Sequence, residues 1–149
     1  MKTIYLTVSP SGGGKSTLAE KLAADNHATI VSSDAIREEL TGDATNQTLN
    51  SYIFGTLIPQ RIREGLAHGD VIFDATNTTR RSRKSICDIA KSSGARVVAY
   101  VLNVSIEECK RRNSLRSRVV PEFVIDKQFR EYQLPDTSAE RIDEIIYVD

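Results

Sequence analysis

The sequence predicts an α/β fold in which a doubly wound, mostly parallel sheet of five strands carries helices on both faces. Two observations support this prediction. Apolar segments with strand character alternate along the chain with segments whose apolar residues repeat at helical spacing. The strand-like segments are apolar throughout, as expected of strands that are covered on both faces. They lie at residues 4–8, 29–31, 71–73, 97–102 and 145–148.

Two helices are expected between the second and third strands. A short one contains Ile36 and Leu40, and Ser33 or Asp34 is placed to cap its first turn. A longer one carries apolar residues at one-face spacing from 49 to 66. Because proline lacks an N–H group and its ring clashes with the preceding turn, we expect a kink or break at residue 59.

Three further helices follow from local capping patterns. One is expected over residues 79–93, with Gly94 ending it in a left-handed conformation. Residues 105–108 have the spacing of a capping box, which begins the next helix. Pro121 suits the first turn of a last helix that Pro135 stops.

Length, charge and cysteine content limit the possible functions. The 149 residues are most simply one domain. Lys plus Arg and Asp plus Glu both number 20, so the formal net charge is zero and any nucleic-acid site must be a local patch. Cys87 and Cys109 match no metal or redox spacing, so we expect reduced thiols in a cytoplasmic protein. The sequence has no long apolar run, and no membrane partner is expected.

The segment 9–17 reads as a phosphate-binding loop between the first strand and the first helix. Glycines without a Cβ let backbone N–H groups turn onto phosphate oxygens, and the helix that follows adds the positive end of its dipole. Lys15 would reach the β- and γ-phosphates, and Ser16 would bind Mg²⁺. The loop predicts ATP and Mg²⁺ as cofactors, held by Ser11, Gly12, Gly13, Gly14, Lys15, Ser16 and Thr17.

Ser9 departs from the usual pattern of this loop. It stands where the first glycine of G-x-x-x-x-G-K-[ST] is expected. The alternative is a glycine-rich linker, but a linker would not need a lysine and two hydroxyls after its third glycine. The strand before the loop and the helical pattern after it favour a P-loop NTPase fold of the nucleoside-kinase type.

Asp34 and Arg37 follow the second strand, at the sheet edge where the glycine-rich loop opens. A carboxylate there can accept the proton of an attacking hydroxyl, and an aspartate has this role in phosphoryl transfer. Arg37, one turn later, could hold an acceptor phosphate in a fork. The alternatives are that Asp34 only caps the helix and that Arg37 is an exposed charge.

Asp74 ends the third strand and is a candidate for supporting Mg²⁺ or positioning substrate, with Asn77 as a further substrate-binding candidate. Ala75 stands where a hydrolysing ATPase commonly has glutamate, and Asn77 where a D-x-x-G switch has glycine. The sequence contains no N-K-x-D guanine signature. Water is therefore the less favoured acceptor of the phosphoryl group.

Two basic clusters occur in the second half of the chain. Most of their members are expected to be solvated charges on helix faces. Arg112 and Arg116, however, precede the joint between two helices and could belong to a helical lid at about 110–121. Arginines there would neutralise charge on the transferred phosphoryl group. The clusters are Arg80, Arg81, Arg83 and Lys84, then Lys110, Arg111, Arg112, Arg116 and Arg118.

Taken together, these motifs resemble the kinase domain of phage T4-type 5′-polynucleotide kinases, within the wider group of small P-loop kinases. The similarity spans nearly the whole chain. It depends on the segments 2–4 and 12–17, on Asp34 with Arg37, on Asp74 with Asn77, and most specifically on Arg112-Asn113-Ser114-Leu115-Arg116 followed by Val120-Pro121.

The resemblance implies a role for several residues. Asp34 would be the general base that activates a 5′-hydroxyl, Arg37 would contact the acceptor phosphate, and Arg116 would be the lid arginine on the donor phosphates. Lys15 and Ser16 match the family's phosphate loop, and Asp74 matches its second active-site aspartate. Val120 would pack against the acceptor nucleobase.

This chain departs from the family pattern at three places: Ser9 replaces a glycine, Ala75 adds a residue within the aspartate motif, and no D-x-D-x-T phosphatase segment precedes the end at Asp149. The last point implies kinase activity without 3′-end processing. We expect an ATP-dependent kinase that acts on the 5′-hydroxyl of a DNA or RNA end, as in nucleic acid repair. The alternatives are a kinase for a small-molecule hydroxyl and a non-catalytic ATP-binding regulatory module.

Overall fold

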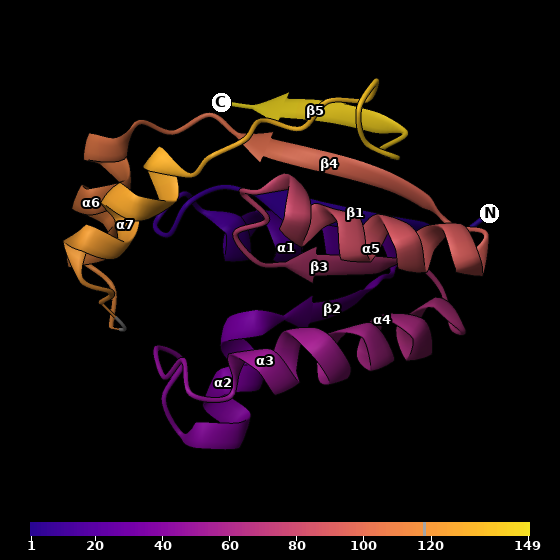
Figure 1. Cartoon of the computed structure of the whole chain (residues 1–149), viewed down its shortest axis with the longest axis horizontal. Coiled ribbons are helices and arrows are strands. Elements are labelled where there is room, and N and C mark those ends of the chain that lie inside the picture. Colours follow the sequence, from indigo (N-terminus) through magenta and orange to yellow (C-terminus); the bar gives the residue numbers. More distant parts are fainter. Residues whose placement is uncertain (118) are drawn as a thin grey trace.

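The computed structural model describes residues 1–117 and 119–149, and its centre is a parallel sheet of five strands (Figure 1). The strands lie in the order β2-β3-β1-β4-β5, and every described pair of neighbours is parallel. The predicted fold class is thus confirmed. The strands are β1 (Thr3–Val8), β2 (Thr29–Ser32), β3 (Val71–Asp74), β4 (Arg96–Leu102) and β5 (Glu144–Val148).

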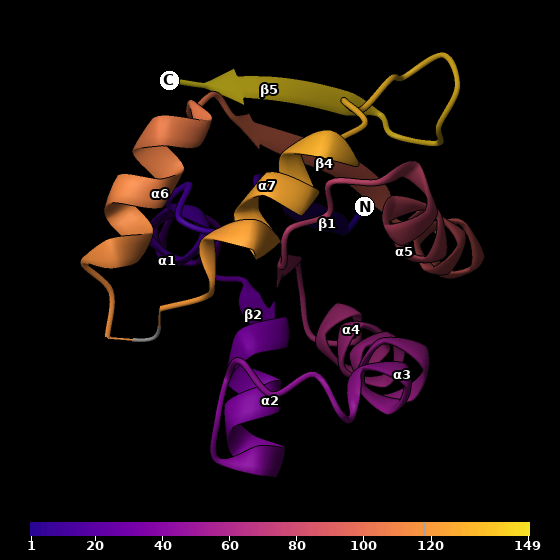
Figure 2. The same cartoon turned by 60° about the vertical axis from the view of Figure 1, so that its left-hand side comes forward.

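Helices cover both faces of the sheet (Figure 2). On one face, Ala19 and Leu22 of α1 pack on Ile72 of β3. On the other face, the apolar sides of α4 and α5 pack on β1, β3 and β4 and form the larger core. The helices are α1 (Lys15–Asn26), α2 (Ser33–Thr41), α3 (Asn50–Tyr52), the π-helical turn η1 (Ile53–Leu57), α4 (Ile58–Leu66), α5 (Arg80–Ser93), α6 (Ile106–Ser114) and α7 (Glu122–Arg130).

The carboxyl ends of the strands lie at one edge of the sheet, and α6 and α7 lie together beyond it (Figure 1). The loops after β1, β2 and β3 therefore meet under these two helices. This is the edge at which ligands bind in open parallel sheets. None of the described helices is both long enough and apolar enough to cross a lipid bilayer.

The start of α2 differs from the prediction. Ser32, not Ser33 or Asp34, caps the helix, because its extended backbone lets its hydroxyl accept a hydrogen bond from the N–H of Ala35 at 3.2 Å. Asp34 then lies inside the first turn, with its carboxylate free of the capping role. The alternative that Asp34 only caps the helix is therefore wrong.

The predicted effect of Pro59 appears as a change of helix type. The helix does not break, because η1 precedes α4 and the N–H of Ile58 donates to the carbonyl of Ile53, five residues back. In a regular α-helix the proline ring clashes with the carbonyl four residues before it. The wider π-helical turn moves that carbonyl, and π-helical turns are frequent at functional sites.

The end of α7 was predicted too late. The helix ends at Arg130, before Pro135, because the N–H of Gln133 donates to the carbonyl of Thr78 at 2.7 Å. That bond draws the chain toward the loop after β3. The predicted end of α5 at Gly94, with φ 68°, and the predicted cap of α6 at Ser105 are confirmed, whereas Thr79 is the N-cap of α5 and not its first residue.

Candidate active site

The glycine-rich loop has the backbone that only glycine adopts easily. Gly12 and Gly14 have φ values of 86° and 94°, in the left-handed region. A Cβ on Gly12 would lie 2.3 Å from the carbonyl oxygen of Cys109 in α6. Any side chain there would push the loop away from α6. These glycines keep the concave backbone that a phosphate group would occupy.

The departure at Ser9 is matched by a second departure at Gly13. Ser9 is fully buried, and its hydroxyl donates to the carbonyl of Pro10 at 2.9 Å. A Cβ on Gly13 would lie 1.7 Å from that hydroxyl oxygen and 2.9 Å from the Ser9 Cβ. The serine side chain therefore fills the space beside residue 13, and the glycine at 13 makes room for it. The loop keeps its shape although its first glycine is absent.

Lys15 and Asp74 approach each other below the loop. Burial lowers the pKa of the Lys15 ammonium, and the nearby carboxylates of Asp74 and Asp34 oppose that shift. Burial raises the pKa of Asp74, opposed by Lys15 and by the hydroxyl of Ser16. The Ser16 hydroxyl donates to Asp74 Oδ2 at 3.2 Å. Residues from the loop, from β3 and from α2 therefore share one electrostatic environment.

Ser16 and Asp74 fit the requirements of a magnesium site. Mg²⁺ prefers hard oxygen donors and usually retains several waters, so one or two protein ligands are enough. A hydroxyl and a carboxylate held 3.2 Å apart at the mouth of the phosphate loop are such a donor set. No larger cluster of His, Cys, Asp or Glu suited to a metal occurs within residues 1–117 and 119–149.

Asp34 and Arg37 form an ion pair on α2. Arg37 Nη1 lies 2.8 Å from Asp34 Oδ1, and only 8% of the Arg37 surface is exposed. Its Nε donates to Asn50 Oδ1 at 2.8 Å, and its guanidinium carbon lies 5.5 Å from the centre of the Phe54 ring. The alternative of Arg37 as an exposed charge is wrong. Asn50 and Phe54 are residues that the sequence reasoning missed.

The two lid arginines reach both sides of the site. Arg116 Nη2 lies 4.0 Å from Asp34 Oδ2, and its charge also acts on Lys15. Arg112 Nη1 donates to the carbonyl of Gly13 at 3.3 Å, while its Nε donates to Glu108 at 2.9 Å. Arg118, which belongs to the expected lid, lies outside the described residues.

Asn113 fixes one end of the segment that carries Arg116. It is buried, its Nδ2 donates to the carbonyl of Val120 at 2.7 Å, and its Oδ1 accepts from the N–H of Val120 at 3.1 Å. One side chain thus ties the end of α6 to the start of α7. Asn113 belongs to the segment on which the family resemblance depends, and a polar residue on the inner face of a helix is the signal that indicates its structural role.

Gln128 of α7 is another residue whose contact with the site the sequence did not predict. The N–H of Ser11 donates to Gln128 Oε1 at 2.8 Å, and Gln128 Nε2 donates to the Ser11 hydroxyl at 3.1 Å. The helix after the lid therefore holds the apex of the glycine-rich loop. Thr17 is exposed in the first turn of α1.

Asn77 does not present its side chain to this group of residues. It is buried with φ 49°, and its Nδ2 donates to the carbonyls of Thr7 and Ala75 at 2.9 and 3.3 Å. Those bonds hold the loop after β3 in shape. Its proposed contact with substrate stays a prediction, and the described contacts favour a structural role.

The first basic cluster divides into buried and exposed members. Arg83 is fully buried, contrary to the expectation of a solvated charge, and pairs with Glu140 at 2.8 Å. Its other N–H groups donate to the carbonyls of Asn77 and Gln133, both at 2.7 Å. This network joins the loop after β3 to the segment after α7.

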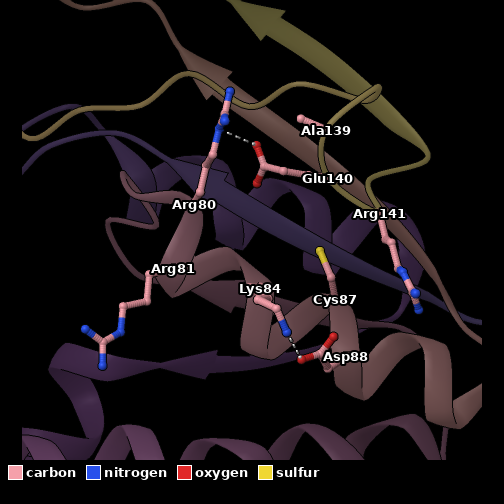
Figure 3. A pocket seen from close by; sticks show the side chains of 8 residues that line it. All are labelled: Arg80, Arg81, Lys84, Cys87, Asp88, Ala139, Glu140 and Arg141. Carbon is pink, nitrogen blue, oxygen red and sulfur yellow. Dashed lines mark hydrogen bonds and ion pairs between the residues drawn. The ribbon is translucent and has the colours of Figure 1, made fainter.

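The exposed members line a cavity of about 360 Å³ on the outer side of α5 (Figure 3). Lys84 pairs there with Asp88 at 2.9 Å, and Arg80 lies 3.9 Å from Glu140. Burial raises the pKa of the Cys87 thiol to about 11, so it stays protonated at neutral pH. Both cysteines are free and buried, as expected. The lining residues are Arg80, Arg81, Lys84, Cys87, Asp88, Ala139, Glu140 and Arg141.

The sequence over residues 4–135 matches a family model described as an AAA domain. The chain belongs to the AAA domain family. A comparison with curated proteins gives no significant match. Among solved structures, Chaetomium thermophilum Kti12 in complex with ADP-AlF3 has a TM-score of 0.77 at 13% identity, with 97% of this chain and 88% of that chain covered.

Two other similar structures are kinases. A fungal RNA kinase has a TM-score of 0.68 at 19% identity, with 99% of this chain and 38% of that chain covered. The Mycobacterium tuberculosis APS kinase CysC, in complex with AMPPNP and APS, has a TM-score of 0.65 at 16% identity, with 99% and 88% covered. These likenesses place this AAA domain chain in the P-loop NTPase fold. The closer resemblance to phage T4-type kinases stays a prediction.

Proposed function

We propose that the chain is a single kinase domain, over residues 1–149 with a lid at about 110–121, that moves the γ-phosphoryl group of ATP to the 5′-hydroxyl of a DNA or RNA end. The supporting observation is that charged groups from separate segments converge. Asp34 of α2 lies 4.0 Å from Arg116, and the charges of both residues shift the pKa of Lys15 in the phosphate loop. In this proposal the triphosphate binds on the Lys15 and Arg116 side, and the acceptor oxygen lies at Asp34.

Asp34 is proposed as the general base. Its carboxylate takes the proton of the 5′-hydroxyl as that oxygen attacks the γ-phosphorus, and the bond to the oxygen that bridges the β- and γ-phosphates breaks, so that ADP leaves. Arg37 is held on Asp34 at 2.8 Å and aims its remaining donors at the phosphate that follows the first sugar. It thereby positions the acceptor.

The cationic groups are proposed to stabilise the charge that develops on the transferred group. Lys15 binds the β- and γ-phosphates, and Arg112 and Arg116 close over the donor from the lid. Ser16 and Asp74 would hold Mg²⁺, which neutralises phosphate charge when it is bound. Burial favours neutral Asp74 and neutral Lys15, so a bound cation and a bound polyphosphate would each favour the charged form.

A kinase for a small-molecule hydroxyl is the second candidate. The formal net charge of zero favours it, because a protein that binds long nucleic acids commonly carries a basic excess. The fold is also shared with a kinase crystallised with APS. A non-catalytic ATP-binding module is the third candidate, and it predicts that Asp34 is dispensable for all measurable function.

The test is a transfer assay with labelled ATP, Mg²⁺ and a panel of 5′-hydroxyl oligonucleotides, nucleosides and sugars. Label on the oligonucleotides supports the proposal. Label only on small metabolites would overturn it in favour of the second candidate. ATP binding with no transfer to any acceptor, and no effect of Asp34→Asn, would favour the regulatory module.

A further inference from the structure

Phe54 occupies an unusual position beside the candidate acceptor site. It lies in η1, the π-helical turn, and its ring packs 5.5 Å from the guanidinium carbon of Arg37. The residue nevertheless keeps 39% of its surface exposed. Ile53 of η1 and Ile58 of α4 face the core and are buried, whereas the Phe54 ring, which contacts Arg37, is not fully covered. Phe54 therefore offers aromatic surface to a ligand.

Arg37 is fixed in place and keeps donors for a ligand. Its Nε donates to Asn50 and one Nη1 hydrogen donates to Asp34, both at 2.8 Å. A guanidinium has five N–H groups, so the hydrogen bonds among residues 1–117 and 119–149 use two of the five. With Phe54 against it, this guanidinium has little freedom to rotate. The remaining donors are held ready for an anionic group.

The side chains of Asp34, Arg37 and Phe54 follow one another in space in that order. Asp34 contacts Arg37, and Arg37 contacts Phe54, which places Arg37 between the carboxylate and the ring. A nucleic acid read from its 5′ end has the same sequence of groups: a hydroxyl, a sugar, a phosphate, and then the second nucleoside with its flat base. Stacking of bases on aromatic rings is sequence-tolerant because every base has a π-face.

We propose that Phe54 stacks the base of the second nucleotide of the acceptor, while Arg37 binds the phosphate between the first and second nucleotides. The inference rests on the proposed function, because it takes Asp34 as the place of the 5′-hydroxyl. It predicts that, among acceptors with a 5′-hydroxyl, those with a second nucleotide bind more tightly than a nucleoside 3′-monophosphate. Phe54 is then a specificity-determining residue that contacts substrate without taking part in the chemical step.

The experiment measures KM and kcat of the full chain for three acceptors with a 5′-hydroxyl: a dinucleotide, the same dinucleotide with an abasic second residue, and a nucleoside 3′-monophosphate. We expect Phe54→Leu to raise KM for the dinucleotide roughly tenfold or more, the scale of one lost base stack. KM for the other two acceptors, and KM for ATP, stay within about twofold. Phe54→Tyr keeps the ring and restores the dinucleotide KM.

Tyr52→Leu is the matched control, because Tyr52 is an even more exposed aromatic on the neighbouring α3, at 49% against 39% for Phe54. It leaves all three KM values unchanged. If Phe54→Leu raises KM equally for all three acceptors, Phe54 only supports Arg37 and the stacking proposal is overturned. If the unaltered chain binds ATP but labels none of the three, the proposed function itself is overturned, and the two failures are thus distinguishable.

Discussion

Two groups of charged residues in this protein, one around Arg83 and one around Lys15, are built in opposite ways. Around Arg83, every partner is in place: Glu140 supplies a carboxylate, and two backbone carbonyls accept the other donors. Around Lys15, the ammonium reaches the carbonyl of Pro10 at 3.3 Å, and burial lowers its pKa. The first group is complete as it stands, whereas the second is organised to receive charge from a ligand.

The difference separates a structural ion pair from a candidate active site. Buried charges cost stability unless they are paired and hydrogen-bonded. The Arg83 pair satisfies that condition and joins the loop after β3 to the segment after α7. Lys15 and Asp74 carry pKa shifts against their charged forms, and such shifts are common at functional sites.

The largest effect is expected on stability, when the group of residues around Arg83 is disrupted. Arg83→Met removes the guanidinium and leaves the Glu140 side chain, which is 8% exposed, without its close ion pair; Arg80 at 3.9 Å and the N–H of Asp136 remain. We expect the free energy of unfolding to fall by about 3–5 kcal/mol, measured by urea denaturation. Lys84→Met is the matched control, because Lys84 pairs with Asp88 on the exposed side of the same helix, and its cost should stay below about 0.5 kcal/mol. Equal costs for both variants would contradict the comparison.

The next largest effect is expected on catalysis, when Asp34 in the group around Lys15 is replaced. Asp34→Asn should lower kcat for phosphoryl transfer by about a hundredfold or more, the contribution of a general base. The affinity for ATP should hardly change, because Asp34 is assigned to the acceptor and not the donor. Glu39→Gln on the same helix, whose carboxylate pairs with Arg61 at the surface, is the control and keeps full activity. An unchanged kcat in Asp34→Asn would rule out the catalytic assignment.

A smaller effect tests the pairing of Ser9 with Gly13. Gly13→Ala places a Cβ 1.7 Å from the Ser9 hydroxyl oxygen, and such overpacking costs about 1–3 kcal/mol. In the double variant with Ser9→Gly the obstructing side chain is gone, and the nearest remaining atom is the Pro10 carbonyl oxygen at 3.2 Å. We expect a double-mutant cycle on stability and ATP affinity to recover most of the loss. Purely additive effects would contradict the steric account.

The smallest effect concerns stability and pH. Burial raises the pKa of Asp74 in the folded protein, so folding favours the protonated carboxyl. The stability of the unaltered chain without ligand should therefore fall as pH rises from the unfolded pKa through the folded pKa, and stay lower above it. Asp74→Asn removes that loss, so its Tm should exceed that of the unaltered chain at neutral pH but not in acid. A lower Tm at neutral pH would show that the carboxylate stabilises the fold.

The fold was predictable because short, local sequence patterns indicate apolar strands and helix caps. The parallel sheet, the cap at Ser105 and the left-handed Gly94 all agree with the prediction. The end of α7 did not, because a bond between Gln133 and Thr78 joins residues distant in sequence. Local patterns carry no information about such a partner.

The candidate site was predictable to a similar extent. Lys15, Asp34 and Arg116 follow recognisable motifs, and the structure brings them together. The residues that hold their neighbours were missed: Asn50 and Phe54 contact Arg37, and Gln128 bonds to Ser11, through contacts that no motif contains. The prediction for Arg83 was wrong for the same reason. Its position in a basic stretch does not indicate that it pairs with the carboxylate of Glu140, 57 residues later.

The exchange between Ser9 and Gly13 has a consequence for how related chains are found. A sequence motif that requires glycine at the first position of the loop would not match this chain. The missing side chain is instead at Gly13, four residues later. In this loop the space beside Ser9 limits the combined size of the two side chains at positions 9 and 13. A motif that accepts a small residue at either the ninth or the thirteenth position would reflect this steric requirement. It would also match chains, such as this one, that the usual motif excludes.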